Sequence, residues 1–583
     1  MDFFSILTLI GGLGLFLYGM DVMGDNLKKL AGGKLEMILS KLTSNNIMGF
    51  LLGFFVTAII QSSSATTVML VGFVNSGIMK LAQTIGVIQG ANVGTTVTAW
   101  ILSLTGITGD TFILKMFKPT SFTPLLMGIG VIMTMVAKKD KNKDIGGILI
   151  GFSVLMFGMN IMSDAMSGLK NSEAFGQMLV MFSNPIMGIL AGTILTAIIQ
   201  SSSASVGILQ ALALTGAIPY STAIPIILGQ NIGTTITPIL SSITGNTESK
   251  RVAFACLYIK ILGVIIVGAG FYVLNAVFEF DFMNSNISVL AIATIHTLFN
   301  VISTVILMPF SKAIEKMTVV TIKKKKNEEN TQFDTLDDRF LDIPSFAIDK
   351  CRELVCEMAE KTRDLILKST GLMYNYDKDL VKAIGEGEDA IDMYEDKIST
   401  YLVKISSGNL SSKDSKTVTE LLHCIGDFER ISDHAESITR SMTEVHDKQI
   451  SFSSEAQKEL EVISRAVTDV LVMTTDAFIN EDLELAKNVE PLEQVVDKLR
   501  NKIKTNHVAR LQDGKCSIEL GFILSDLLNN FERVADHCSN IAACLLEIAH
   551  GSFDVHEYLN ELKSGDDEFI KQYREYKKKY VLK

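Results

Sequence analysis

The chain has 583 residues and a formal net charge of −11, with 48% hydrophobic and 20% charged residues. Residues 1–310 hold 12 acidic and 15 basic side chains, whereas residues 311–583 hold the other 52 acidic and 38 basic ones. This division indicates a membrane half followed by a soluble half, and it argues against a nucleic-acid-binding protein. The seven cysteines form no CxxC framework, which fits a reducing cytoplasm.

The N-terminal segment lacks the basic region and the cleavage site of a signal peptide, so we expect it to remain as a membrane helix. Stretches close to the ~20 residues of a bilayer-spanning helix are 3–22, 83–104, 123–137, 145–165, 222–243, 252–275 and 287–310. Two other apolar stretches, 47–60 and 184–199, stop at a Gln-Ser-Ser-Ser run after covering only ~22 Å. They predict re-entrant hairpins built from half-helices, because unwound backbone is tolerated only inside protein or beside a water-filled cavity.

The distribution of basic residues predicts the orientation. With the N-terminus outside, only Lys115, Lys118 and Lys170 fall outside. The basic residues that fall inside are Lys28, Lys29, Lys34, Lys41, Lys80, Lys138, Lys139, Lys141, Lys143, Lys250 and Arg251. The positive-inside rule therefore predicts that the basic run 323–326 and everything after it are cytoplasmic.

The membrane half repeats itself at a constant offset of 139 residues. NNIMGFLLGFFVTAIIQSSSA (45–65) matches NPIMGILAGTILTAIIQSSSA (184–204), and GANVGTTVT (90–98) matches GQNIGTTIT (229–237). Three crossings separate corresponding points, so the copies, about 1–137 and 145–310, are predicted to be inverted. Inverted repeats with discontinuous helices at their meeting point are typical of secondary transporters.

Small polar residues in membrane helices usually serve packing, but two QSSSA runs that each interrupt a half-length helix favour a binding site. Residues 1–310 contain one arginine, Arg251, so half-helix N-termini and serine hydroxyls would hold an anion. Neutral oxygen ligands suit Na⁺. The predicted substrate and Na⁺ ligands are Gln61, Ser62, Ser63, Ser64, Thr66, Asn92, Thr95, Thr96, Gln200, Ser201, Ser202, Ser203, Ser205, Asn231, Thr234 and Thr235.

The doubled QSSS with its N-x-G-T-T segments resembles the type II sodium/phosphate cotransporter family over about residues 1–310. The resemblance implies that the two QSSS runs hold phosphate and Na⁺ near the bilayer centre. Other polar residues give weaker signals. Asp25 and Asp164 suit capping or ion coupling equally, Lys260 is expected to snorkel toward the cytoplasm, and helix packing is favoured for His296 and Asn300.

The soluble half follows a charged linker, 311–340, and ends in a charged tail, 551–583. Its periodicity of 3.6 residues predicts six helices near 344–373, 378–407, 412–445, 453–480, 483–511 and 517–548. This half also repeats: DFERISDHAESI (427–438) matches NFERVADHCSNI (530–541).

Each half of this second repeat carries two E-x-x-x-D pairs, and the spacing puts both carboxylates on one helix face. A single pair is usually a solvated face, but two such helices side by side would bring four carboxylates together, around a metal ion or in a shared interhelical network. The predicted metal ligands are Glu388, Asp392, Glu429, Asp433, Glu493, Asp497, Glu532 and Asp536. The pattern resembles a PhoU-like domain over 341–550, which implies two three-helix bundles, a divalent or ferric metal and a link to phosphate signalling. Asn530 stands where the first half has Asp427, and a ligand role for His434 and His537 stays open.

Together these features predict an all-α, multi-pass protein of the cell membrane with a cytoplasmic PhoU-like domain. The leading hypothesis is Na⁺-coupled transport of inorganic phosphate with regulation by the soluble half. Transport of another oxyanion, an H⁺-coupled phosphate exporter and a membrane-anchored signalling module are the alternatives. The sequence leaves open whether the chain forms a homodimer and whether it binds phosphate-signalling proteins. The sequence contains no Walker, GxSxG or zinc motif of the kind that would indicate an enzyme.

Overall fold

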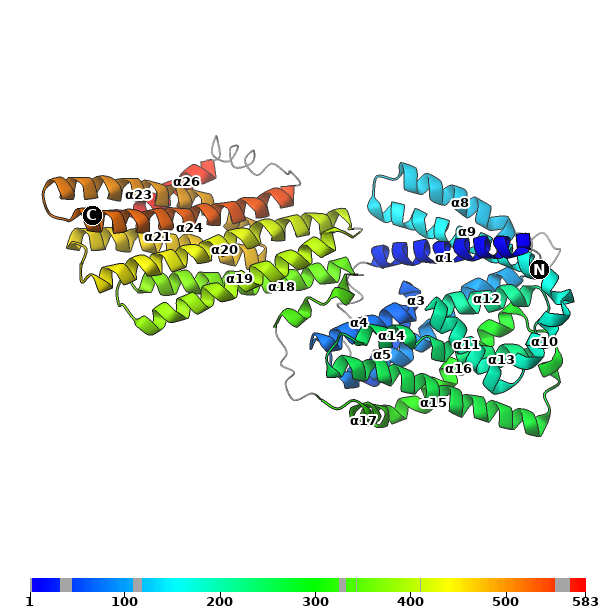
Figure 1. Cartoon of the computed structure of the whole chain (residues 1–583). Helices are drawn as coiled ribbons and strands as arrows, with labels where there is room; N and C mark the ends of the chain where they lie inside the picture. Colours follow the sequence, from blue (N-terminus) through cyan, green and yellow to red (C-terminus); the bar gives the residue numbers. More distant parts are fainter. Residues whose placement is uncertain are drawn as a thin grey trace. The chain divides into compact units, whose positions relative to one another are not determined.

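Helices make up almost all of the secondary structure in this computed structural model, which describes residues 3–31, 45–107, 118–324, 332–341, 343–408, 410–550 and 567–582 (Figure 1). Over these residues the β-structure is limited to an isolated bridge between Pro219 and Asn286. The chain divides into two units, Met1–Phe346 and Ala347–Lys583. The all-α, multi-pass fold class predicted from the sequence is confirmed.

The first unit contains the membrane helices. Their bounds are α1 Phe3–Ala31, α3 Asn46–Ile60, α4 Ser63–Asn75, α5 Leu81–Gly94, α6 Thr96–Ser103, α8 Pro119–Val136, α9 Asp140–Met166, α10 Glu173–Phe182, α11 Pro185–Ile199, α12 Ser202–Leu214, α13 Tyr220–Gly233, α14 Ile236–Ser242, α15 Thr247–Phe278, α16 Val289–Leu307 and α17 Ser311–Thr321.

Six helices of the described residues are long and apolar enough to cross a membrane, and the pair α10 and α11, bent by 104°, is a further candidate. The expected spans 83–104 and 222–243 are each interrupted inside the N-x-G-T-T motif, between α5 and α6 and between α13 and α14. The expected span 123–137 lies in α8, whose apolar part, Ser121–Val136, is shorter than the other spans.

Helices α1 and α9, the first of each repeat, pack along their lengths with α8 beside α9 (Figure 1). Glycines permit this approach: a Cβ on Gly19 would lie 2.3 Å from Leu155 N, and one on Gly158 would lie 2.4 Å from Phe16 N. Because real Cβ atoms do not come so close to backbone, larger residues at these positions would force the helices apart. The backbones of α1 and α9 therefore touch directly.

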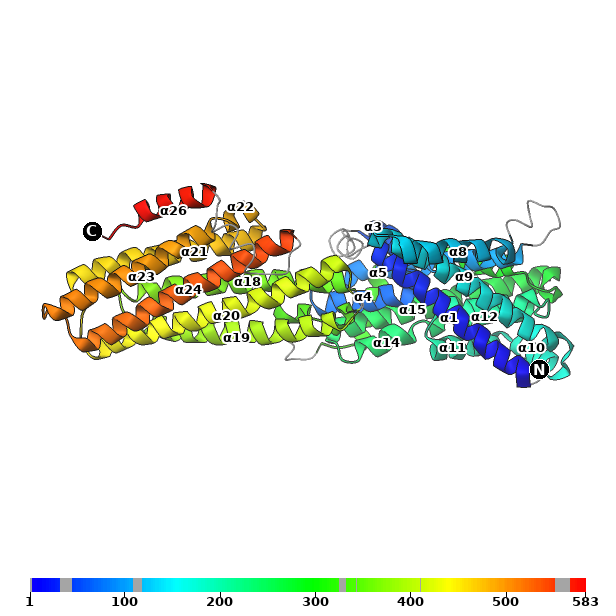
Figure 2. The same cartoon turned by 90° about the horizontal axis from the view of Figure 1, so that it is seen from above.

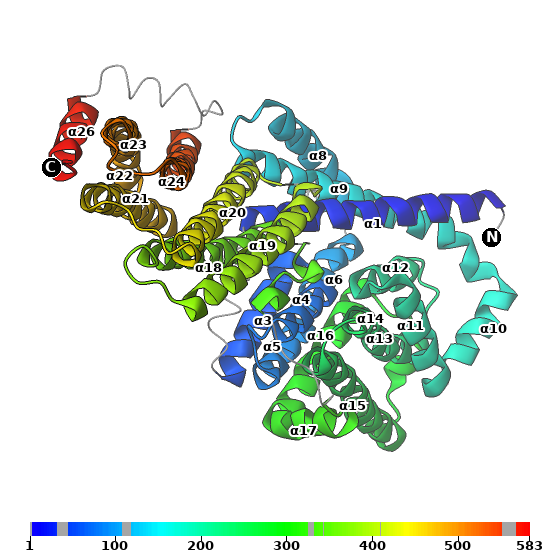
Figure 3. The same ribbon diagram turned by 60° about the vertical axis from the view of Figure 1, so that its left-hand side comes forward.

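The second unit is a bundle of long helices that run side by side (Figures 2 and 3). Its helices are α18 Pro344–Gly371, α19 Lys378–Ser406, α20 Ser412–Asp447, α21 Ser454–Asn480, α22 Leu483–Ala486, α23 Val489–Gln512, α24 Ile518–His550 and α26 Asp567–Lys579. All six predicted helices are present, the fifth divided into α22 and α23. Helices α20 and α24 join the two three-helix sets.

The segments expected as a linker and a tail contain ordered structure. Within 311–340, α17 packs on α15, and Phe340 packs on Phe73 of α4 with ring centroids 5.5 Å apart. Within the tail, α26 packs on α23, and Asp469 of α21 accepts hydrogen bonds from Lys579 and Tyr580. Residues 325–331 and 551–566 lie outside the described residues.

Candidate functional site

Both QSSS runs break a membrane helix in the same way. Gln61 ends α3 in the left-handed region with φ 60° and ψ 21°, and Gln200 ends α11 with φ 59° and ψ 17°. Such a conformation is uncommon for a residue other than glycine. Each next half-helix then begins at a serine cap, because Ser62 Oγ accepts from Ala65 N–H and Ser201 Oγ accepts from Ala204 N–H.

The half-helices of each repeat are also joined by a pair of hydroxyl groups. Thr57 Oγ1 donates to Thr66 Oγ1 at 3.0 Å, and at the same positions of the second repeat Thr196 Oγ1 donates to Ser205 Oγ at 2.8 Å. Thr66 and Ser205 were predicted as ligands, but both are buried and brace the break rather than line the cavity described next.

One cavity of about 360 Å³ brings the two QSSS runs together. Residues 61–64 and 200–203 line it, and helix α1 contributes the rest of the polar wall with Asp21, Asp25 and Lys28. The N-termini of α4 and α12 both begin in this wall. Since the first N–H groups of a helix lack partners inside it, the cavity offers donors from two helices.

The α1 side chains give the cavity its charges. Lys28 Nζ lies 3.3 Å from Asp25 Oδ1, so these two form an ion pair, whereas Asp21 adds a further carboxylate. The predicted ligands included neither Asp21 nor Asp25, for which capping and ion coupling were equally suitable, although the spacing of the two by one helical turn indicated a shared face. Asp164, the repeat counterpart of Asp25, is not part of this wall.

The N-x-G-T-T residues are buried behind the cavity. Thr95 Oγ1 lies 3.4 Å from Ser202 Oγ of the other repeat, so the two motifs meet. The hydroxyls of Thr96, Thr234 and Thr235 donate to carbonyls of the preceding helical turn. Asn92 and Asn231 are both buried, and Asn231 contacts a lysine.

In the first repeat, a hydrogen bond joins the QSSS run to the segment that contains N-x-G-T-T, and the described residues of the second repeat lack this bond. Gln61 Oε1 accepts from Thr98 Oγ1 at 2.9 Å. The corresponding residues of the second repeat are separate: Gln200 is exposed, and Thr237 Oγ1 is buried without a partner. We call the Gln61–Thr98 contact the latch, and the two repeats differ in whether it is closed.

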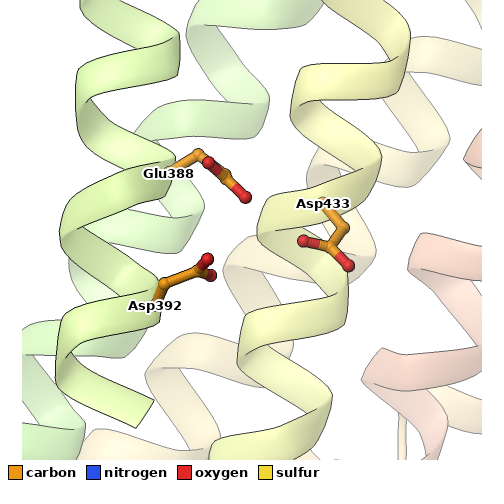
Figure 4. Close-up of side chains that lie close together, drawn as sticks. All are labelled: Glu388, Asp392 and Asp433. Carbon is orange, nitrogen blue, oxygen red and sulfur yellow. The ribbon is translucent and has the colours of Figure 1, made fainter. Parts of the chain in front are cut away.

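In the second unit, three of the predicted metal ligands come together. Glu388 and Asp392 on α19 and Asp433 on α20 point toward one another, with oxygens within 4.8 Å, as Figure 4 shows. Burial and the nearby Asp392 carboxylate raise the pKa of Glu388 to about 7. Burial and the Asp433 carboxylate raise the pKa of both Asp392 and Glu429, which lies beside the group. We call Glu388, Asp392 and Asp433 the first acidic cluster.

The second set of predicted ligands has a different arrangement. Arg500 forms ion pairs with Glu532 and, at 3.6 Å, with Asp497, and Arg533 lies 3.5 Å from Asp536. With Glu493 these residues form no comparable metal-binding group in the described part of the chain. The sequence indicated this difference between the two sets, because Arg500 stands where the first half has Glu395.

The two histidines beside the motifs connect the halves of this unit. His434 Nδ1 lies 2.8 Å from Asn530 Oδ1, and His537 Nδ1 lies 2.8 Å from Asp427 Oδ1, so α20 and α24 exchange contacts. These histidines therefore hold the bundle together and take no part in the first acidic cluster.

A helical membrane unit with a polar cavity between two broken helices is typical of a secondary transporter, and comparisons with known proteins agree with this class. Residues 15–164 and 154–291 each match the Na⁺/Pi-cotransporter family, and residues 355–442 and 460–545 each match the PhoU domain. Residues 15–291 therefore carry the Na⁺/Pi-cotransporter domain and the C-terminal part carries a PhoU domain, so the family matches point to a phosphate transporter.

Among its relatives, the chain is 23% identical to the "Putative inorganic phosphate export protein YjbB" of Salmonella typhimurium, over 93% of this chain and 98% of that one. It is 37% identical to sodium-dependent phosphate transport protein 2A of Rattus norvegicus, over 16% of this chain and 15% of that one. The crystal structure of PhoU from Pseudomonas aeruginosa aligns with 35% of this chain and 97% of that one, with 21% identity and a TM-score of 0.34.

Proposed function

We propose that this chain couples the movement of inorganic phosphate across the cell membrane to Na⁺, with the PhoU domain as a cytoplasmic regulator. The observation that carries the proposal is the cavity in which both QSSS runs meet. Two helix N-termini and the hydroxyls of six lining serines suit a tetrahedral oxyanion, since phosphate is commonly bound by such N–H groups.

The charges of the cavity wall support coupling to a cation. Lys28 neutralises Asp25, so Asp21 remains when phosphate enters with its own negative charge. Two like charges 4 Å apart repel by about 4 kcal/mol at an effective dielectric constant of 20. A co-bound Na⁺ would remove this repulsion, and the amide and hydroxyl oxygens nearby are suitable ligands.

Flux of labelled phosphate in proteoliposomes tests this function. We expect uptake to follow an imposed Na⁺ gradient and to reverse with it, and unlabelled phosphate to compete better than sulfate. Competition by sulfate alone would assign another oxyanion, and equal flux driven by a pH gradient without Na⁺ would assign H⁺ coupling. Direction in the cell depends on the gradients, and the name of the YjbB relative indicates export for that protein.

The location of the PhoU domain can be measured separately. We expect a cysteine at the exposed Lys382 of α19 to react with an impermeant maleimide only after the cells are opened. A cysteine at the exposed Ser285 is the control that should react in intact cells, because the loop between α15 and α16 falls outside when the basic ends of the helices are inside. Peptide mapping distinguishes these labels from the native cysteines, and labelling at position 382 in intact cells would reverse the topology.

We also propose that the first acidic cluster binds a divalent or ferric metal ion. Three carboxylates within 4.8 Å repel one another unless a cation lies between them, and hard cations prefer such oxygen ligands. A bound metal would fix α19 against α20 and thereby regulate transport without taking part in it.

A further inference from the structure

Lys260 of α15 is a buried lysine inside the membrane unit, with only 4% of its surface exposed. Its ammonium group lies 2.9 Å from Asn231 Oδ1 and 3.4 Å from Asn300 Oδ1 of α16. The expectation that it snorkels toward the cytoplasm is therefore wrong. No carboxylate in the described residues forms an ion pair with it, so amide oxygens alone compensate for its charge.

The two amides are oriented as acceptors for this cation. Asn231 Nδ2 donates to Ile227 O at 3.0 Å, and Asn300 Nδ2 donates to His296 O at 2.9 Å. Because each amide nitrogen is held by a carbonyl of its own helix, each amide oxygen is directed at Lys260. The result is a cation site in which a protein group is the cation.

The first repeat has the same motif without such a group. Asn92 is the counterpart of Asn231 at the 139-residue offset and is also buried. Its side chain makes no hydrogen bond in the described residues, and no lysine or arginine there contacts it. The two N-x-G-T-T motifs thus differ in whether the protein supplies a positive charge.

An ammonium group and Na⁺ need the same kind of partner, an oxygen with a partial negative charge. They exclude each other at one site, since two cations 4 Å apart repel by about 4 kcal/mol even at an effective dielectric constant of 20. A buried lysine without a carboxylate is also costly, and ionisable residues at membrane depth generally mark functional positions. The ammonium group of Lys260 therefore leaves no room for a Na⁺ ion beside Asn231.

We propose that the ammonium group of Lys260 occupies the cation position of the second repeat, so that coupling Na⁺ binds at the first repeat, around Asn92. This inference rests on the proposed Na⁺ coupling and makes it asymmetric between two nearly identical motifs. Removing the ammonium group should open a further Na⁺ site beside Asn231.

The test compares the Na⁺ dependence of phosphate flux for the full chain, Lys260→Gln and the matched control Lys250→Gln in proteoliposomes. Lys250 is on the same helix but does not contact either amide. We expect the control to behave as the wild type, and Lys260→Gln to show a steeper Na⁺ activation with one more Na⁺ moved per phosphate. An active Lys260→Gln protein with the wild-type Na⁺ dependence would overturn the inference.

The same data separate this inference from the proposed function. A wild type without Na⁺ dependence would refute the proposed coupling, yet Na⁺ dependence that appears only in Lys260→Gln would still support the role of Lys260. If neither protein responds to Na⁺, both proposals fail.

A binding measurement covers the case of an inactive Lys260→Gln protein. Trp100 is the single tryptophan of the chain, follows the first motif in α6 and donates to Thr297 Oγ1 of α16 at 2.9 Å, so its fluorescence can report Na⁺ binding there. In the purified full-length protein, Asn92→Ala should weaken the Na⁺ response far more than Asn231→Ala does. An equal or opposite ranking would overturn the assignment.

Discussion

Ser62 and Ser201 have two functions at once, because each caps a half-helix and each lines the cavity. The side-chain oxygen accepts an N–H of its own helix, which leaves the hydroxyl proton to donate to an anion. Replacing such a cap with alanine costs about 1 kcal/mol of helix stability, and a hydrogen bond to a charged ligand contributes about 1.5–3 kcal/mol.

We therefore predict that Ser62→Ala and Ser201→Ala each lower the affinity for phosphate roughly 10- to 100-fold, as expected for losing a hydrogen bond to a charged ligand, and that the double variant loses most of its flux. Flux should be normalised to protein recovered in the membrane. Ser285→Ala, in a loop remote from the cavity, is the control. Unchanged flux in the double variant would remove the QSSS runs from the binding site.

For individual residues, the sequence indicated that the two QSSS runs belong to one site, and both line the cavity, but it did not indicate the whole cavity wall. The exact duplication made residues 61–64 and 200–203 recognisable, whereas the α1 contribution depends on long-range packing that a repeat does not reveal. Thr66 and Ser205 lie outside this wall for a physical reason. Each lies within the first turns of its half-helix and bonds to the preceding half-helix, so its hydroxyl is directed away from the cavity.

Helices α19 and α20 concentrate carboxylates whose protonation must affect the stability of the bundle. The pKa of Glu388 is raised to about 7 from its usual value of 4.5. A carboxyl group with a raised pKa destabilises the folded state where it is ionised, and this penalty disappears as the folded state takes up a proton.

We thus predict that the metal-free protein gains stability in α19 and α20 as pH falls from about 7 toward about 4.5, the interval between the folded and unfolded pKa values. Hydrogen exchange of these helices in the full-length protein measures it. Glu388→Gln should remove most of this pH dependence, and exchange rates corrected for intrinsic chemistry that stay constant with pH would contradict the prediction.

The two acidic sets should differ in metal binding, because arginines neutralise the second. We predict that Asp392→Asn removes bound metal, measured by elemental analysis of the purified protein, whereas Asp497→Asn leaves the metal content unchanged. Retained metal in Asp392→Asn would exclude the first acidic cluster, and loss in both variants would indicate a shared site.

Element boundaries in this half followed the predicted ones closely, because strong amphipathic periodicity and turn residues determine them locally. The division of residues 483–511 into α22 and α23 was not expected. The breaks inside the N-x-G-T-T motifs were also not expected, because hydropathy continues through both segments. In the second copy the sequence held a signal, since Pro238 cannot donate to the carbonyl of Thr234, four residues earlier.

For the molecule as a whole, the segment before the PhoU domain is attached to the half-helix that carries the first QSSS run. Asn75 of α4 donates to Asp337, while Phe340 and Phe346 pack on Phe73. Arg339 also donates to Ser241 O at 3.2 Å. These contacts lie far apart in sequence, which is why a charged, apparently featureless segment was expected to be only a linker.

We predict that a chain ending at Phe346 inserts and transports phosphate, because the first unit contains the whole cavity. A chain ending at residue 322 should lose stability by exposing Phe73, and its flux should fall below that of the longer truncation. Thermal unfolding and flux of the two truncations decide this. A correctly inserted 1–346 chain without flux would mean that the PhoU domain is needed for transport itself.

The latch, closed as Gln61–Thr98 and open at Gln200 and Thr237, has a consequence for the energy balance of the transport cycle. Alternation is fast only when the two end states have similar free energies, and a ligand can shift such an equilibrium only by its differential affinity. We propose that the two end states exchange the latch between the repeats, so that opening one latch, at about 1 kcal/mol, is offset by closing its duplicate. Under this proposal the duplicated sequence would make the two states almost equal in free energy without any tuning of individual contacts. The small differences between the repeats, such as Asp21 against Asn160, then determine which state an empty protein prefers.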